Sequence, residues 1–265
     1  MSATEADGAL AGLHVLVTRP AHQAEPLCAA LTAEGALPVR FPVLEILDPV
    51  DSGPLLAVID RLDEYDIAVF VSPNAVVKAM NLIMARRTLP PTLQFAAVGR
   101  VSAKELRRFI GRDADIFPPR KFDSEALLEQ PALQQVAGKR IIIFRGGGGR
   151  EHLGNVLKER GAQVDYAEAY RRGRPRADVD VLLRAWARGE VDIIAVTSGE
   201  GLRNLFDMVG KLGQHWLRKT PLVVVHERMA QLAEELGFKE PPVVAAEASD
   251  AAIVEAIRQW HKKRT

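Results

Sequence analysis

Apolar residues along the chain fall into short, nearly unbroken runs that alternate with longer stretches of helical period. The runs cover residues 13–18, 66–71, 94–98, 140–144, 191–196, 221–225 and 242–245. Continuous apolarity is typical of strands that are buried on both faces, as in a parallel sheet between two layers of helices. The pattern therefore predicts an α/β fold.

Helix boundaries are also marked in the sequence. Ser72 followed by Pro73 predicts an N-cap and a first helical position, because the serine hydroxyl accepts a free N–H and proline needs none there. Glycines stand where three helices are expected to end, namely Gly35, Gly161 and Gly237.

The two halves of the chain repeat one another at a constant distance. An offset of 126 residues relates several pairs that occupy matching strand ends and helix ends: Arg19 and Arg145, Leu31 and Leu157, Gly35 and Gly161, Asp66 and Asp192, and Ser72 and Ser198. A loose alternation of strands and helices does not explain a constant offset over about 100 residues. The sequence predicts one α/β unit written twice.

Two extended segments without helical period follow the first helix of each copy, at 37–49 and 162–173. The first holds three prolines, which argues against a central strand. Running side by side, the two segments would form a two-stranded connector. Residues 1–36 and 174–265 would then form one discontinuous domain and residues 50–161 the other. A tandem division at 1–130 and 131–265 is the alternative.

Composition narrows the class of protein. Apolar residues make up 48% and charged residues 26% of the 265 residues, which excludes a disordered or fibrous chain. Lys and Arg number 35 against 34 Asp and Glu, so a binder of nucleic acid or of membrane surfaces is not indicated. The apolar runs are too short to cross a bilayer.

The first twelve residues and the cysteine count bear on location. No Lys or Arg precedes Arg19, so we expect no secretory signal and a cytoplasmic location. The one cysteine, Cys28, cannot form an internal disulfide. No Cys/His cluster has metal-ligand spacing, and we expect no metal site.

Candidate ligand-binding residues lie in the turns that follow the strands. In open parallel sheets, ligands bind at the carboxyl ends of strands, near helix N-termini that favour anions. These turns are rich in hydroxyls, glycines and arginines and poor in proton-transfer groups. The residues expected to bind an anionic substrate are Arg19, Ser72, Asn74, Gly99, Ser102, Arg145, Gly146, Gly147, Thr197, Ser198 and Gly199.

Several of these residues also have a purely structural interpretation. Ser72 and Ser198 cap helices in addition to any binding role. Arg19 and Arg145 either form ion pairs within the fold or contact a ligand. The glycine run 146–149 is either a flexible turn or a set of backbone amides that approaches an anion. It lacks the dinucleotide fingerprint, and no P-loop, nucleophile elbow or zinc-protease motif is present.

The basic stretch and the tyrosines beside the second extended segment allow two interpretations as well. The arginines between 171 and 176 are either a solvated linker or a surface that steers an acidic substrate. Tyr166 is expected in the core. Tyr170, four residues further on, is expected to face differently or to lie at a domain mouth.

With these motifs in order, the chain resembles the uroporphyrinogen-III synthase family. The resemblance rests on VLVTRP (15–20), FVSPNAV (70–76), AVGRVSAKEL (97–106), the segment 138–164 followed by AEAYRR (167–172), and VDIIAVTSGEGL (191–202). It implies two similar three-layer α/β/α domains, joined by two antiparallel strands, with the cleft between them as the active site. It thus implies the segment-swapped duplication described above.

The resemblance also implies the chemistry. The family closes the linear tetrapyrrole hydroxymethylbilane, with loss of water and inversion of ring D, through an azafulvene cation and a spiro-pyrrolenine. No cofactor or metal is required. The family's candidate acid, a tyrosine at the end of the second connector, falls on Tyr170. Ser102 corresponds to a family threonine, and Thr197-Ser198 to its Thr-Ser turn.

One loop departs from the family pattern. The second copy of its V-G-x-x-T-A pattern is VHERMA (225–230), so His226 and Met229 stand in place of glycine and threonine. Either this loop binds through main-chain N–H groups or its missing hydroxyl is dispensable.

The expected partner is a small molecule, a linear tetrapyrrole polycarboxylate, and neither nucleic acid nor membrane. We expect a monomer with transient contact to the preceding pathway enzyme. Two alternatives remain open: a non-catalytic two-domain anion-binding module, and a nucleotide-dependent α/β enzyme that uses the glycine run.

Overall fold

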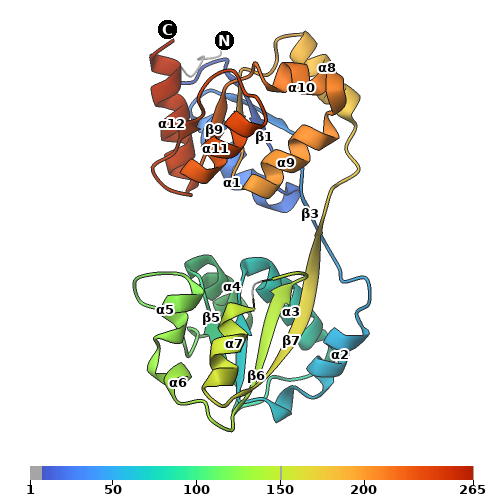
Figure 1. Ribbon diagram of the computed structural model, residues 1–265, viewed down its shortest axis with the longest axis vertical. Coiled ribbons are helices and arrows are strands. Elements are labelled where there is room, and N and C mark those ends of the chain that lie inside the picture. Colours follow the sequence, from blue (N-terminus) through green and yellow to red (C-terminus); the bar gives the residue numbers. More distant parts are fainter. Residues whose placement is uncertain (1–7, 150, 265) are drawn as a thin grey trace, which may run out of the picture. The chain divides into compact units, whose positions relative to one another are not determined.

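The structure is a computed structural model that describes residues 8–149 and 151–264. Residues 1–7 of the N-terminal stretch and Arg150 of the glycine turn lie outside the described residues. Every apolar run predicted to be a strand overlaps one, and helices follow most strands (Figure 1). The chain divides into two compact units. Unit 1 comprises residues up to Glu45 and from Gly173 onwards, and unit 2 comprises Ile46–Arg172.

Unit 1 is built around a five-stranded sheet in the order β10-β9-β8-β1-β2, in which each adjacent pair is parallel. Its strands are β1 (His14–Val17), β2 (Leu37–Arg40), β8 (Ile193–Ala195), β9 (Leu222–Val224) and β10 (Val243–Val244). Its helices are α1 (Ala21–Ala33), α8 (Val179–Ala187), α9 (Gly199–Met208), α10 (Gly210–Leu217), α11 (Glu227–Glu235) and α12 (Asp250–Lys262). Helix α1 packs against α12, and α9 packs against α10 and α11.

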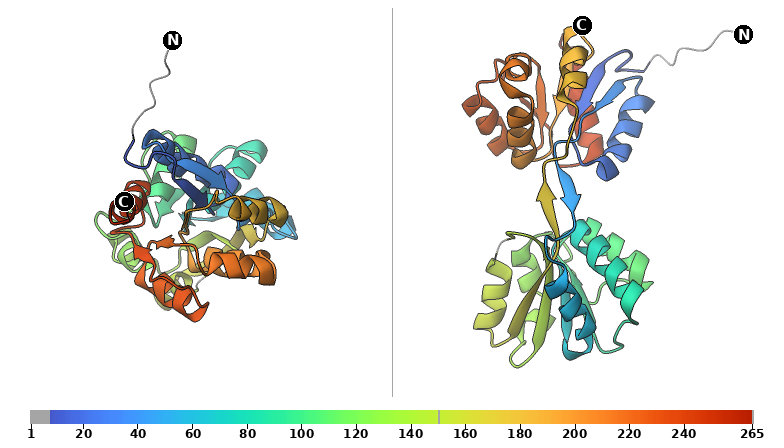
Figure 2. Two further views of the ribbon diagram at one scale, coloured as in Figure 1. Left: turned by 90° about the horizontal axis from the view of Figure 1, so that it is seen from above. Right: turned by 90° about the vertical axis from the view of Figure 1, so that its right-hand side faces the viewer.

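Unit 2 holds a second five-stranded sheet, in the order β3-β7-β6-β4-β5. Its strands are β3 (Glu45–Leu47), β4 (Ile67–Phe70), β5 (Gln94–Ala97), β6 (Arg140–Gly146) and β7 (Gln163–Gly173). Its helices are α2 (Gly53–Asp60), the 3-10 turn η1 (Leu62–Glu64), α3 (Pro73–Arg86), α4 (Arg100–Ile110), α5 (Ser124–Leu128), α6 (Pro131–Gln134) and α7 (His152–Glu159). Figure 2 shows helices on both faces of each sheet.

Burial within unit 2 explains the unbroken apolar runs. Successive residues of a strand enter opposite hydrophobic clusters: Phe70 and Phe144 belong to one cluster, and Val69 and Ile143 to the other. The rings of Phe70 and Phe144 stack with centroids 5.0 Å apart. Because side chains alternate across a pleated strand, both faces of this sheet are buried. The predicted three-layer α/β/α arrangement is confirmed.

The two sheets are assembled from exchanged segments. The segment β1-α1-β2 opens the chain but pairs with β8, which comes from the second half. Its counterpart β6-α7-β7 lies in the second half and pairs with β4 from the first. The repeat is thus a duplication in which each unit carries the first strands of one copy and the later strands of the other.

The observed division differs from the expected boundaries. Residues 37–49 and 162–173 were expected to lie outside both domains as connector strands. Instead, β2 pairs with β1 at the edge of the unit 1 sheet, a position that tolerates Pro38 because an edge strand needs fewer N–H donors. Strand β7 pairs with β6 and also neighbours β3, so parts of the two extended segments do run side by side, as expected of a connector. The division falls within β3 and at the end of β7.

Local signals for helix ends agree with the structure. The Ser72 hydroxyl accepts a hydrogen bond from the Ala75 N–H at 3.1 Å, and Pro73 begins α3. Gly35, Gly161 and Gly237 have φ of +85°, +86° and +84°, the left-handed conformation that glycine adopts at low cost.

Candidate functional site

The predicted site residues of unit 2 meet at the carboxyl edge of its sheet. Ser72 follows β4 and caps α3, with Asn74 in the first turn of that helix. Gly99 follows β5 and caps α4. Arg145 and Gly146 end β6, and Tyr170 lies on β7. Since all four strands end at one edge, the topology gathers these residues at the place where parallel sheets bind ligands.

Tyr170 is buried against this edge, with only 3% of its surface exposed. Its hydroxyl lies 3.1 Å from the Ser72 hydroxyl, which also accepts the Ala75 N–H. Tyr170 was expected to face differently from Tyr166 or to lie at a domain mouth. It does face differently, because Tyr170 belongs to one hydrophobic cluster of unit 2 and Tyr166 packs against the other. The phenol belongs to the same hydrophobic cluster as Phe70 and Phe144, and its hydroxyl contacts Ser72, the N-cap of α3.

The glycine run fits closely around Tyr170. A Cβ on Gly146 would lie 2.6 Å from Cζ of the Tyr170 ring, so no side chain fits there. The Gly147 N–H donates to the Tyr170 carbonyl at 2.9 Å, beside a register shift that pairs Gly146 with Tyr170. The backbone amide of Gly147, predicted to face an anion, is thus already engaged within the fold.

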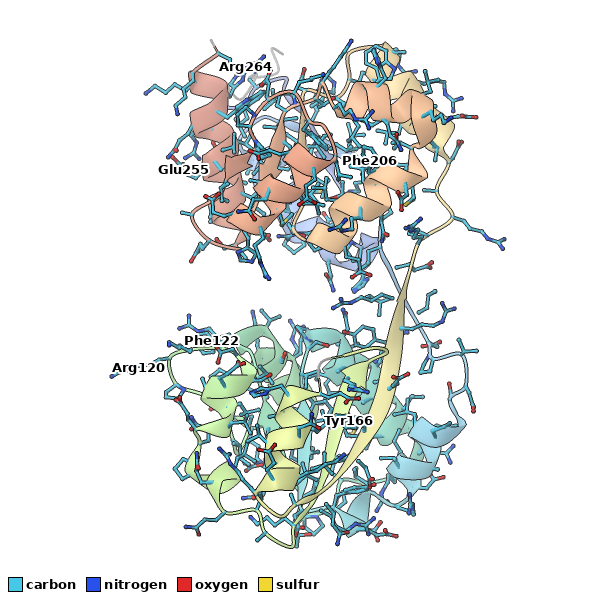
Figure 3. All side chains as sticks on the ribbon, viewed as in Figure 1. Arg120, Phe122, Tyr166, Phe206, Glu255 and Arg264 are labelled. Carbon is cyan, nitrogen blue, oxygen red and sulfur yellow. The ribbon has the colours of Figure 1, made fainter. Side chains whose placement is uncertain are left out.

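Arg145 holds the same turn from the other side. Its guanidinium lies 4.1 Å from the centre of the Tyr166 ring, and Nη1 donates to the Gly149 carbonyl at 3.0 Å. Its Nε is buried and has no hydrogen-bond partner among the described residues. Burial raises the pKa of the Tyr166 phenol, and the Arg145 charge opposes that rise. Tyr166 is labelled in Figure 3.

A surface groove of about 350 Å³ opens beside Ser72 in unit 2. Its predicted members are Ser72, Gly99 and Ser102, with Ser102 almost completely buried. Arg100 and Phe122 also line it, and the Arg100 guanidinium lies 4.3 Å from the centre of the Phe122 ring. Figure 3 labels Phe122, which lies in the loop before α5.

Sequence reasoning missed both of these lining residues. Arg100 stands next to Gly99 in a turn already identified, so its position was a usable signal. Phe122 lies outside the strand-end turns, and no spacing pointed to it.

Unit 1 carries an equivalent set of turns at the carboxyl edge of its own sheet. Thr197, Ser198 and Gly199 follow β8, and the Ser198 hydroxyl accepts the Gly201 N–H at 3.0 Å. These three residues line a groove of about 560 Å³. Its remaining lining residues come from α9 and from the start and body of α11: Glu200, Arg203, His226, Arg228, Met229, Gln231, Leu232 and Glu235.

The divergent VHERMA loop forms part of this groove. His226 caps α11 with extended backbone, as Gly99 caps α4 in unit 2. An imidazole therefore stands where the first copy has no side chain. Arg203 and Arg228, which the sequence did not single out, bring side-chain cations to a groove whose counterpart in unit 2 has Arg100.

Arg19 is engaged within unit 1. Its guanidinium forms an ion pair with Asp250 at the start of α12, and its side chain is only 16% exposed. Beside it, the buried Thr18 hydroxyl donates to the Ala195 carbonyl at 2.9 Å. Of the two interpretations of Arg19, the structure contains the ion pair.

Within residues 8–149 and 151–264, no group of three or more His, Cys, Asp or Glu side chains is arranged to hold a metal ion. No helix in the same residues combines the length and apolar composition needed to cross a membrane.

Comparisons with known proteins agree on one family. The sequence model described as uroporphyrinogen-III synthase HemD matches residues 25–255. The uroporphyrinogen-III synthase of Escherichia coli (strain K12) is 36% identical over 249 residues, which cover 93% of this chain and 100% of the relative. That of Synechococcus elongatus is 32% identical and covers 98% and 100%, respectively.

A solved structure agrees at the level of the fold. The crystal structure of a mutant uroporphyrinogen III synthase from the extremely thermophilic bacterium Thermus thermophilus superposes with a TM-score of 0.61 at 21% identity, covering 96% of this chain and 100% of the other. The family match spans most of the chain, and full-length relatives exceed 30% identity. The chain belongs to the uroporphyrinogen-III synthase family.

Proposed function

We propose that this chain converts hydroxymethylbilane to uroporphyrinogen III, as a lyase of tetrapyrrole biosynthesis that removes one water and inverts ring D. Family membership supports the reaction, and the polar turns at the two sheet edges support the class of substrate. Each pyrrole ring carries an acetate and a propionate, so the substrate is a polyanion. Helix N-termini and arginines are the groups that bind carboxylates.

The binding residues proposed for the substrate carboxylates come from both sheet edges. They are Arg19, Ser72, Asn74, Gly99, Ser102, Arg145, Gly146, Gly147, Thr197, Ser198 and Gly199. Within this set, Arg19, Arg145 and Gly147 act by holding their turns, because their N–H groups are already engaged by Asp250, the Gly149 carbonyl and the Tyr170 carbonyl, respectively. Arg100, Arg203 and Arg228 add cations to the two grooves.

The difficult part of this reaction is selection. The bilane also closes unaided, without inversion, so the protein must hold a flexible chain in the arrangement from which the disfavoured attack occurs. That is catalysis by positioning and by selective binding of the transition state. A ten-thousand-fold preference for the inverted product requires about 5.5 kcal/mol, which several charge-assisted hydrogen bonds can supply.

Tyr170 is the proposed acid for departure of the hydroxyl group. The phenol O–H of a tyrosine donates a hydrogen bond, and its oxygen also accepts one. The observation that carries this role is the contact between the Tyr170 and Ser72 hydroxyls at 3.1 Å, at the edge of the sheet where ligands bind. The reaction is redox-neutral, and the proposal includes no cofactor.

The test is direct. Purified protein is given hydroxymethylbilane, and the I and III isomers of the product are separated and quantified. The III isomer, formed faster than spontaneous closure, is the expected result. The I isomer alone, at the uncatalysed rate, would overturn the proposal and favour an anion-binding module. Light scattering during the same preparation tests the further proposal that the protein is a monomer. Titration with the preceding pathway enzyme tests a transient contact.

A further inference from the structure

The groove of unit 2 and the Tyr170 phenol do not meet directly. Ser72 lines the groove, whereas Tyr170 is not among its lining residues and is only 3% exposed. A bound substrate in this groove would contact the serine hydroxyl first. The tyrosine hydroxyl stands one hydrogen bond behind it, at 3.1 Å.

The direction of that hydrogen bond follows from the number of donors and acceptors. The Tyr170 hydroxyl has no other partner among the described residues, and a buried hydroxyl needs an acceptor for its proton. The serine oxygen has two lone pairs and one proton. One lone pair accepts the Ala75 N–H at 3.1 Å, and the other accepts Tyr170. The serine proton is then free to point into the groove.

The fold holds the phenol in this place. The glycine turn packs against the ring at Gly146, where a Cβ would lie 2.6 Å from Cζ. The Gly147 N–H fixes the Tyr170 carbonyl at 2.9 Å. A ring held by its neighbours and its own backbone is poorly placed to swing outward, so a proton leaving Tyr170 has its shortest route through Ser72.

We infer that Ser72 relays the proton from Tyr170 to the leaving hydroxyl of the substrate. This inference rests on the proposed function, and it assigns to Ser72 a role beyond binding and helix capping. Ser72 is the group that meets the leaving oxygen, and Tyr170 is the source of the proton.

The step balances in atoms and charge. The bond between carbon and oxygen of the substrate's hydroxymethyl group breaks, and its electron pair goes to oxygen. That oxygen takes the Ser72 proton and leaves as water, while the Tyr170 proton moves to the serine oxygen. A phenolate on Tyr170 and an azafulvene cation remain. Ring closure later releases one proton from a pyrrole ring, which restores the phenol.

The second copy of the fold supports a specific role for this pair. Ser198 caps α9 as Ser72 caps α3, and its hydroxyl accepts the Gly201 N–H at 3.0 Å. In the described part of unit 1, no tyrosine contacts it, and the chain's three tyrosines, Tyr65, Tyr166 and Tyr170, all belong to unit 2. Both copies therefore have the serine N-cap, but only the copy with Ser72 has a tyrosine beside it that can supply a proton.

The experiment compares Ser72→Ala, Ser72→Thr, Tyr170→Phe and the double variant of Ser72→Ala with Tyr170→Phe, all as full-length protein. The kcat for formation of the III isomer is measured in each. We expect each single loss of a hydroxyl to lower kcat by roughly 100-fold, the range of general acid catalysis. The double variant should lose no more, because both residues serve one proton path. Ser72→Thr keeps the hydroxyl and should retain kcat within a few fold.

Ser249→Ala is the matched control for the helix cap. Ser249 caps α12 through the same contact, with the Ala252 N–H at 3.2 Å, and lies outside both grooves. It should lose thermal stability and keep kcat, which separates cap loss from proton transfer.

Three results would overturn the relay while leaving the proposed function intact. The first is that the wild-type protein forms the III isomer and Ser72→Ala does so with the same kcat. The second is a loss of kcat in the double variant equal to the product of the losses in the two single variants, which would show that Ser72 and Tyr170 have independent roles. The third is a kcat in Ser72→Thr as low as in Ser72→Ala. If the wild-type protein itself gave only the I isomer, the proposed function would fail and the relay with it.

Discussion

The Asp192 carboxylate accepts a hydrogen bond from the backbone N–H of His14 at 2.7 Å, joining strands that lie 178 positions apart in the chain. Asp66 does the same in unit 2, where it accepts the Arg140 N–H at 2.8 Å. Each aspartate precedes a central strand and holds the first residue of the exchanged segment that pairs with it. The repeat in the sequence therefore preserves a contact that ties the exchanged strands together.

Replacing Asp192 should loosen unit 1. Asp192→Ala removes the acceptor, and because the carboxylate is 40% exposed we expect a loss of only about 1 kcal/mol in the free energy of unfolding. Asp192→Asn keeps an acceptor and should lose less. The tryptophans Trp186, Trp216 and Trp260 all belong to unit 1, so urea denaturation followed by tryptophan fluorescence reports on this unit. Equal stability of Asp192→Ala and wild type would contradict the prediction.

The strands, the helix starts and the helix ends could be predicted from the sequence, because they depend on local structure. Unbroken apolar runs identified the strands, and Ser72 identified a helix start whose hydroxyl accepts the Ala75 N–H. Gly35 and Gly161 identified helix ends because few other residues adopt their φ of about +85°. The offset of 126 residues revealed the duplication. Apart from this offset, which compares the two halves directly, these signals lie within a few residues of the feature that they specify.

Contacts between distant segments were harder to predict. The ion pair of Arg19 with Asp250 joins residues 231 positions apart, and no spacing favoured it over a ligand contact. The Gly147 N–H is used by the Tyr170 carbonyl only because a register shift brings Gly146 opposite Tyr170. Arg203 and Phe122 line grooves through the packing of helices and loops. Nothing in the sequence around these two residues indicates that they line a groove.

Tyr65 should make the stability of unit 2 depend on pH in the alkaline range. Burial, together with the hydrogen bond to Asp165 at 2.7 Å and its charge, raises the pKa of Tyr65 to about 12. In the unfolded chain the phenol has a pKa near 10. Its contribution to stability is therefore complete below pH 10 and is lost as the pH rises from 10 to 12, by up to about 2 kcal/mol. Tyr65→Phe should show a flatter stability profile in that window, as measured by urea denaturation followed by circular dichroism. Identical slopes for the two proteins would count against this role of Tyr65.

Gly146 should not tolerate a side chain. Alanine at this position would place Cβ 2.6 Å from Cζ of Tyr170, so the ring must move and its contact with Ser72 is lost. We expect Gly146→Ala to lower kcat at least tenfold and the free energy of unfolding by about 1–3 kcal/mol. Gly148→Ala is the control, because a Cβ there meets nothing within 4 Å although its φ is +70°. It should lose some stability and retain kcat. A fully active Gly146→Ala would show that Tyr170 need not stay where it is.

The cations of the unit 1 groove should act on binding more than on turnover. Arg203→Ala and Arg228→Ala each remove a guanidinium that lines the groove, and a charge-assisted hydrogen bond contributes about 1.5–3 kcal/mol. We expect KM to rise about tenfold or more in each variant, with kcat nearly unchanged. Arg188→Ala is a matched control, since Arg188 pairs with Glu190 outside the groove. KM and kcat of the two groove variants, the control and the wild-type protein are measured by steady-state kinetics at two salt concentrations. An unchanged KM in both groove variants would exclude these arginines from substrate binding.

Arg145 should act by ordering the glycine turn. Its guanidinium stacks on Tyr166 and donates to the Gly149 carbonyl. The Gly147 N–H, which fixes Tyr170, lies between Arg145 and Gly149 in the chain. Removing the side chain in Arg145→Ala should let the turn open, so that the Gly147 amide exchanges its hydrogen faster and kcat falls. Lys158→Ala removes the other cation near Tyr166, at 5.5 Å from the ring centre, without touching the turn, and should leave both readouts as in wild type. Hydrogen exchange of the Gly147 amide, read beside kcat, separates the two possible roles of Arg145. A higher KM with unchanged hydrogen exchange would mean that Arg145 contacts the substrate directly. If Arg145 only held the turn, its loss could not weaken substrate binding while the turn stays ordered.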